Sequence, residues 1–169
     1  MSYQEKRTAV SVFSGVLLLV AYGIWALGRI QAGLAASDDL RFWAGAMLTF
    51  VGIGVAANIV IQIVFHIVLS VSHAVKKQVQ DGVYDSKQVE KEIKQEMVED
   101  EMDKLIGLKS MQASFSIAGA GFVAALIALV LGFSPALMLN ILFLSFFAGA
   151  ICEGLVQLYY YKRGVRNGR

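Results

Sequence analysis

The chain has 169 residues, of which 57% are hydrophobic and 17% are charged, with a formal net charge of +2 and a single cysteine. This composition is too apolar for an ordinary soluble domain, in which about a quarter of the residues are charged. The small net charge gives no reason to expect direct nucleic-acid binding, and one cysteine excludes an internal disulfide framework.

Four separate stretches account for the apolar excess. Each is long enough to cross the roughly 30 Å hydrocarbon core of a bilayer as a helix, which takes about 20 residues, and unpaired backbone groups are too costly in lipid for any other conformation. The predicted spans cover residues 10–28, 42–71, 113–131 and 135–161. The sequence therefore predicts an all-α protein, residues 1–169 forming a single integral membrane domain built as a four-helix transmembrane bundle of two helical hairpins.

Aromatic residues mark the outer end of the first hairpin. The first span is expected to be retained, because no small-x-small cleavage site precedes a mature soluble domain. Tyr22 and Trp25 lie toward its far end and Trp43 begins the second span, and such rings favour the headgroup zone. We expect all three at the outer interface, with Ser37 and Asp38 as caps of the second span.

Polar residues recur at helical spacing in the second span. Asn58, Gln62, His66 and His73 fall within an arc of about 80° at 100° per residue. Such a stripe is typical of hydrogen bonds that hold spans together. Because polar side chains are costly in lipid, the alternative is a polar path or ligand site that leads toward the cytoplasm.

The only sizeable polar segment is the stretch 72–109 between the second and third spans. Asp85 and Gln88 have the spacing of a capping box, which predicts a helix start near Ser86. Apolar residues follow at helical spacing (Val89, Ile93, Met97, Met102, Leu105 and Ile106). We expect a cytoplasmic amphipathic helix there, on the inner membrane surface or over the mouth of the bundle.

Acidic residues are concentrated in the same segment (Glu92, Glu96, Glu99, Asp100, Glu101 and Asp103). A solvated helix face explains them better than a cation site, because the Glu-x-x-His pairs of di-metal bundles are missing. His66 and His73 are two turns apart, which one metal ion seldom bridges. We therefore expect no metal, no cofactor and no catalytic residue, and no nucleotide loop or Ser/His/Asp order is present.

The third and fourth spans are joined by little more than residues 132–135. Ser134 as N-cap and Pro135 at the first helical position form a standard helix start, and so short a connection predicts an antiparallel hairpin. Small residues spaced four apart favour close helix approach, within the bundle or in a homo-oligomer (Gly52 and Ala56; Ala120, Ala124 and Ala128; Ala150 and Gly154).

Glu153 is the only acid inside a predicted span, and Gln157 follows it on the same helix face. A carboxylate in a low dielectric is either paired or protonated, and His66, His73 and Lys109 are available partners. Structural pairing and a proton, cation or substrate site both remain open. The candidate site is a polar cluster in the membrane and at the cytoplasmic mouth (Asn58, Gln62, His66, His73, Glu101, Asp103, Lys104, Glu153, Gln157 and Arg163).

Charge placement predicts the orientation. Of the 15 lysines and arginines, only Arg29 and Arg41 lie between the first two spans. Because cytoplasmic loops carry an excess of Lys and Arg, both termini and the central segment are expected on the cytoplasmic side of the cytoplasmic membrane.

Three segments carry a resemblance. Residues 3–7 read YQEKR, residues 99–109 read EDEMDKLIGLK and residues 157–164 read QLYYYKRG. Together they resemble a group of small prokaryotic four-span integral membrane proteins of unknown function with an EDERDKLIxLK-like segment. Met102 and Gly107 depart from the pattern of that group. The resemblance implies a role in stress response or membrane signalling, because genes of the group often neighbour small helix-turn-helix regulators.

Three functional classes follow from these patterns. The sequence favours a non-enzymatic membrane scaffold or regulatory component that acts through a cytoplasmic protein partner or further copies of itself. The first alternative is a small oligomeric transporter or channel that uses Asn58, Gln62, His66 and Glu153. The second is a lipid-modifying membrane enzyme, although no nucleophile–base arrangement is visible.

Overall fold

The computed structural model of the chain describes residues 3–32, 39–80 and 100–164. These residues form helices α1 (Tyr3–Gln31), α2 (Leu40–Gln80), α4 (Glu101–Val130) and α5 (Pro135–Arg163), with no strand among them. Each helix is long and apolar enough to cross a membrane. The predicted all-α, four-helix membrane bundle is confirmed.

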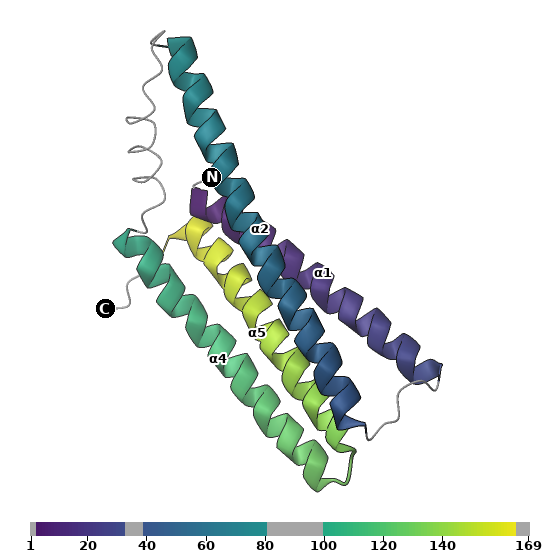
Figure 1. Cartoon of the computed structure of the whole chain (residues 1–169). Helices are drawn as coiled ribbons and strands as arrows, with labels where there is room; N and C mark the ends of the chain where they lie inside the picture. The colour runs from purple at the N-terminus through teal and green to yellow at the C-terminus, as the bar shows by residue number, and fades with distance from the viewer. Residues whose placement is uncertain (1–2, 33–38, 81–99, 165–169) are drawn as a thin grey trace, which may run out of the picture.

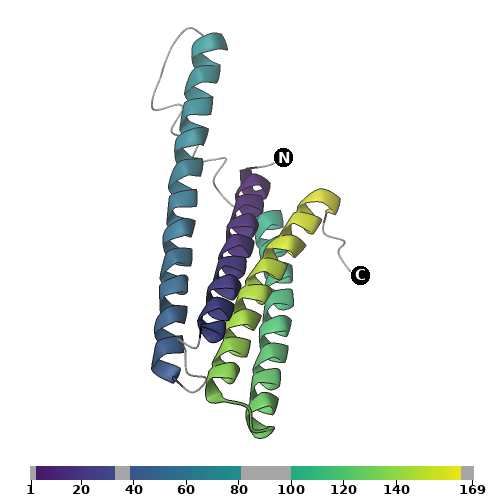
Figure 2. The ribbon, with the colours of Figure 1, turned by 90° about the vertical axis from the view of Figure 1, so that its right-hand side faces the viewer.

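Helix α5 lies at the centre of the bundle. It packs against α4, α1 and α2, and α1 also packs against α2. The free ends of α1 and α5 lie at the same end of the bundle, opposite the α4–α5 turn (Figures 1 and 2). We call this the terminal end. Helix α2 extends beyond the other helices there (Figures 1 and 2).

The helices are longer than the predicted spans. Helix α2 continues to Gln80, and α4 is unbroken from Glu101 to Val130. Residues 101–109 of the predicted cytoplasmic segment are therefore the first turns of α4. The predicted helix start near Ser86, like the caps predicted at Ser37 and Asp38, lies outside the described residues. At the start of α2 the Phe42 amide donates to the Asp39 carboxylate over 3.0 Å.

The α4–α5 hairpin follows the sequence prediction. Gly132 adopts a left-handed conformation (φ 84°) that ends α4, which a residue with a Cβ seldom adopts. Ser134 then caps α5, accepting a hydrogen bond from the Leu137 amide at 3.3 Å, and Pro135 begins the helix. The two helices approach closely: a Cβ added at Gly121 would overlap the Ser145 side chain, and one at Gly149 would lie 2.9 Å from the Ser114 carbonyl oxygen.

An aromatic core joins α1, α2 and α5 at the end opposite the terminal end. Tyr22 is 1% exposed, and its ring lies 5.1 Å from that of Phe50 and 4.5 Å from that of Phe143. Its hydroxyl donates a 2.6 Å hydrogen bond to Asn140. Trp43 is 3% exposed in the same core. This core packs the first turns of α2 against α1 and α5.

Two of the three rings expected at the outer interface point into the bundle and not toward its surface. Tyr22 and Trp43 are buried inside the bundle, and no group in the described part of the chain forms a hydrogen bond with the buried Trp43 indole nitrogen. Trp25 is half-buried and stacks on Phe42 with ring centroids 5.7 Å apart. Mutual packing of rings from neighbouring helices explains their inward direction, because aromatic pairs gain energy beyond simple burial.

Replacing Tyr22 with phenylalanine tests the hydrogen bond to Asn140. We expect the free energy of unfolding to fall by about 0.5–1.5 kcal/mol, the usual range for a hydrogen bond between membrane helices. Titration with SDS in mixed micelles measures it. Tyr159→Phe is the control, because that ring is exposed and its hydroxyl only accepts a 3.4 Å contact from Arg163. An equal loss in both variants would contradict the assignment.

Candidate functional site

A cleft of about 980 Å³ opens among the four helices. Its lining comes from the first half of α1, the middle of α2, the first turns of α4 and the last half of α5. It therefore lies toward the terminal end, away from the aromatic core. The aromatic core fills the space between α1, α2 and α5 beyond it.

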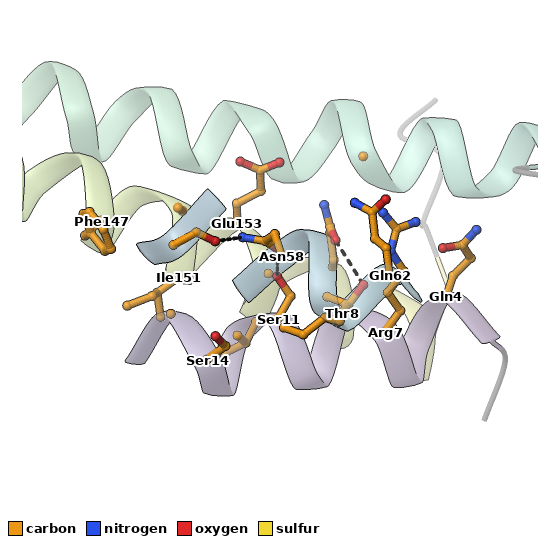
Figure 3. A pocket seen from close by; sticks show the side chains of 18 of the residues that line it. Gln4, Arg7, Thr8, Ser11, Ser14, Asn58, Gln62, Phe147, Ile151 and Glu153 are labelled. Carbon is orange, nitrogen blue, oxygen red and sulfur yellow. Dashed lines mark hydrogen bonds between the residues drawn. The ribbon is translucent and has the colours of Figure 1, made fainter. Parts of the chain in front are cut away.

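Polar side chains of α1 connect the two neighbouring helices across the cleft (Figure 3). The Ser11 hydroxyl donates to the Asn58 side-chain oxygen at 3.2 Å. One turn nearer the terminal end, the Thr8 hydroxyl donates to Gln157 at 3.4 Å. Asn58 and Gln157 therefore have interhelical bonds, the structural role that membrane helices commonly give such residues.

The crossing of α1 and α5 depends on a small residue. A Cβ added at Gly154 would overlap the Val12 side chain and lie 3.9 Å from Thr8. Because Gly154 has no side chain, α1 lies directly on α5 at this point. The neighbouring residue Glu153 is thereby held beside the crossing, at the wall of the cleft.

Glu153 differs from Asn58 and Gln157 in having no interhelical hydrogen bond within the described residues. Its side chain is half-buried, lines the cleft and points away from Ser11 and Asn58, toward α4 (Figure 3). Within residues 3–32, 39–80 and 100–164, no group forms a hydrogen bond or an ion pair with its carboxylate. An ionised carboxylate without a partner is costly in low-dielectric surroundings. Structural pairing with His66 or Lys109 is therefore not the arrangement adopted.

The α4 side of the cleft carries one acid and one cation. Asp103 is already engaged, because it forms a reciprocal capping box with Asp100: each side chain accepts from the other residue's amide. Lys104, the next residue, is exposed at the cleft lining. Asp103 thus serves the helix start, and Glu153 is the acid of the lining without such a role.

The structure brings most of the predicted site residues around one cleft (Asn58, Gln62, Asp103, Lys104, Glu153 and Gln157). Three others do not line it. His66 is exposed on α2, Glu101 is exposed in the first turn of α4, and Arg163 stacks over the Tyr159 ring at 5.3 Å. His73 belongs to α2, and its side chain lies outside the described part of the chain.

The sequence reasoning missed the contribution of α1. The polar residues of its lining face recur three or four positions apart (Gln4, Arg7, Thr8, Ser11 and Ser14). That spacing is the helical signal that identified the stripe in α2. It was overlooked because hydroxyl residues are common in membrane helices and because Gln4 and Arg7 precede the predicted span.

The lining mixes apolar walls with a few charges. Leu18, Val51, Phe146 and Phe147 contribute apolar surface, whereas Arg7 and Glu153 bring opposite charges. Among the described residues, no group of three or more His, Cys, Asp or Glu side chains is arranged to hold a metal ion. A cleft of this kind can bind an amphiphilic molecule or a partner side chain.

Comparison with known proteins gives no relative for this chain. No protein-family model, no curated protein and no solved structure matches it.

Proposed function

We propose that this multi-pass protein is a non-enzymatic scaffold or regulator of the cytoplasmic membrane, with both termini in the cytoplasm, that acts through contacts with a cytoplasmic protein. The terminal end of the bundle is then the cytoplasmic end. The placement of the basic residues supports this orientation, since only Arg29 and Arg41 belong to the opposite side.

The observation that carries the proposal is the length of α2. Helix α2 has 41 residues, whereas α1 and α5 have 29 each. The helix continues to Gln80, and residues 69–80 add about 18 Å at 1.5 Å per residue. Figures 1 and 2 show this extension standing clear of the other helices. A helix that leaves the bundle in this way gives a partner at the membrane a segment to bind.

Contacts between copies are a second part of the proposal. Gly52 and Ala56 of α2 are both exposed, as are Ala120 and Ala124 of α4. Exposed small residues leave room for a helix of another copy to approach. Self-association would place several α2 extensions side by side.

Site-specific photo-crosslinking in cells tests the partner contact. A photoreactive amino acid at Gln78, on the extension, is expected to give one discrete protein adduct, whereas the same group at Phe13, which is 65% exposed on the apolar surface of α1, is not. The adduct is identified by mass spectrometry and verified by reciprocal purification. Adducts at Gln78 with lipid alone would contradict the proposal.

Charge reversal provides a matched test of the same surface. Lys76→Glu with Lys77→Glu on the extension is expected to abolish the adduct. Charge reversal of Lys162 and Arg163, which follow each other at the end of α5, is expected to leave the adduct intact. Equal loss in both variants would indicate a general effect of charge at the membrane surface, against a docking role for α2.

Transport is the second candidate function. It is favoured by the polar cleft, which Asn58, Gln62 and Glu153 line inside helices that can cross a membrane. The aromatic core at the other end of α1, α2 and α5 would have to open for passage through one copy. Solute flux in liposomes that Glu153→Gln abolishes would establish transport, and unchanged flux in that variant would exclude a role for this cleft.

A further inference from the structure

We propose that the cleft binds a lipophilic organic cation, a molecule with a quaternary ammonium or phosphonium centre on an apolar body, with Glu153 as its counter-ion. This goes beyond the scaffold function, because it requires no partner protein. It is also independent of transport, since binding by a single chain is sufficient.

The first argument is the state of Glu153. Its carboxylate is half-buried in a helix that can span a membrane, and no described residue is paired with it. The other acid of the lining, Asp103, is engaged in its capping box. A carboxylate withdrawn from bulk water and left without a partner gains most from a ligand that brings a positive charge.

The second argument is the shape and chemistry of the surrounding walls. The cleft volume of about 980 Å³ is at the upper end of the roughly 300–1,000 Å³ range of small-molecule sites. Phe146 and Phe147 lie on α5 about two turns from Glu153, and Leu18 and Val51 face the same space. The Phe147 ring packs against Phe143 at 4.8 Å, which holds it in place. Aromatic faces attract organic cations as well as apolar groups.

The third argument is the placement of the basic groups. Arg7 and Lys104 also line the cleft, but both belong to the first turns of their helices, and Lys104 is exposed to solvent. Figure 3 shows Arg7 alongside Gln62, whereas Glu153 points toward α4. Gln157, which bonds to Thr8 beside Arg7, lies one turn nearer the terminal end than Glu153, so Glu153 lies about 6 Å deeper along the helix axis. The deep, apolar part of the cleft therefore carries the negative charge.

Two ions of the same shape and opposite charge test the proposal. The full chain, purified in detergent, is dialysed to equilibrium against tetraphenylphosphonium or tetraphenylborate. We expect saturable binding of tetraphenylphosphonium, weakened at least about tenfold by Glu153→Gln. Binding of tetraphenylborate should not weaken in that variant. Glu101→Gln is the matched control, because Glu101 is exposed on α4 and does not line the cleft; it should bind as the wild-type chain does.

Three outcomes of the dialysis experiment would overturn the proposal. The first is a lack of saturable tetraphenylphosphonium binding to the wild-type chain. The second is an equal affinity of Glu153→Gln and the wild-type chain for tetraphenylphosphonium. The third is tetraphenylborate binding that Arg7→Gln abolishes, which would identify an anion site. A measurement on the wild-type chain covers the case in which Glu153→Gln does not fold. Tetraphenylphosphonium should slow the labelling of Glu153 by a hydrophobic carbodiimide, as followed by mass spectrometry, and an unchanged rate would equally refute the site.

Discussion

Truncating Tyr22 to alanine is expected to lower the free energy of unfolding by about 2–4 kcal/mol, because a buried aromatic ring leaves a cavity that its neighbours only partly refill. The ring is 1% exposed and contacts rings of α2 and α5, and its hydroxyl bonds to Asn140. Part of the usual loss of stability comes from transferring the ring out of the solvent, and this part is smaller in lipid than in water. The lost ring contacts and the cavity still lower the free energy of unfolding.

The same variant should also loosen α2. In the part of the chain that the structure describes, the aromatic core packs the first turns of α2 against α1 and α5. Spin labels at Leu48 of α2 and Val130 of α4, both strongly exposed, should show a broadened distance distribution in Tyr22→Ala. Phe13→Ala is the control, since that ring of α1 is 65% exposed. Comparable broadening or destabilisation in the control would contradict a special role of the core.

Replacing Gly121 with alanine is expected to be the second most damaging change. The added Cβ would overlap the side chain of Ser145, so α4 and α5 must separate or Ser145 must move. Overpacking of this kind typically costs about 1–3 kcal/mol. Gly149→Ala should act alike, because its Cβ would lie 2.9 Å from the backbone oxygen of Ser114, which cannot rotate away.

Gly119 provides a control two residues along the same helix. A Cβ added there meets no atom within 4 Å. Gly119→Ala should therefore raise the free energy of unfolding by up to about 1 kcal/mol, because alanine has the higher helix propensity. SDS titration should therefore show a higher free energy of unfolding for Gly119→Ala than for the wild-type chain. The same measurement should show a lower free energy of unfolding for Gly121→Ala and Gly149→Ala. A stabilising effect at Gly121 would refute the close α4–α5 contact.

Some features followed from the sequence with little ambiguity. The four helices could be predicted because about 20 apolar residues in a row have few alternatives to a membrane helix. The start of α5 could be predicted because Ser134 and Pro135 act locally, through one hydrogen bond and one fixed dihedral angle. Asn58, Gln62, Glu153 and other lining residues could be selected because polar side chains inside spans are rare enough to stand out.

Other features depended on the rotation of each helix about its own axis. Tyr22 and Trp43 face inward although their position alone indicated the membrane interface, and His66 does not line the cleft although it follows Asn58 and Gln62 at helical spacing. The polar face of α1 became evident only when Ser11 and Thr8 were seen to bond to α2 and α5.

The sequence by itself determined that this chain forms four apolar helices in two hairpins, since length and hydropathy are summed along the chain. The tertiary structure decided which side of each helix faces its neighbours. The physical reason is the solvent: lipid and bundle interior are both apolar, so the periodicity that orients a helix in water is largely lost. Local contacts then decide, such as Gly154 against Val12 and the stack of rings around Tyr22.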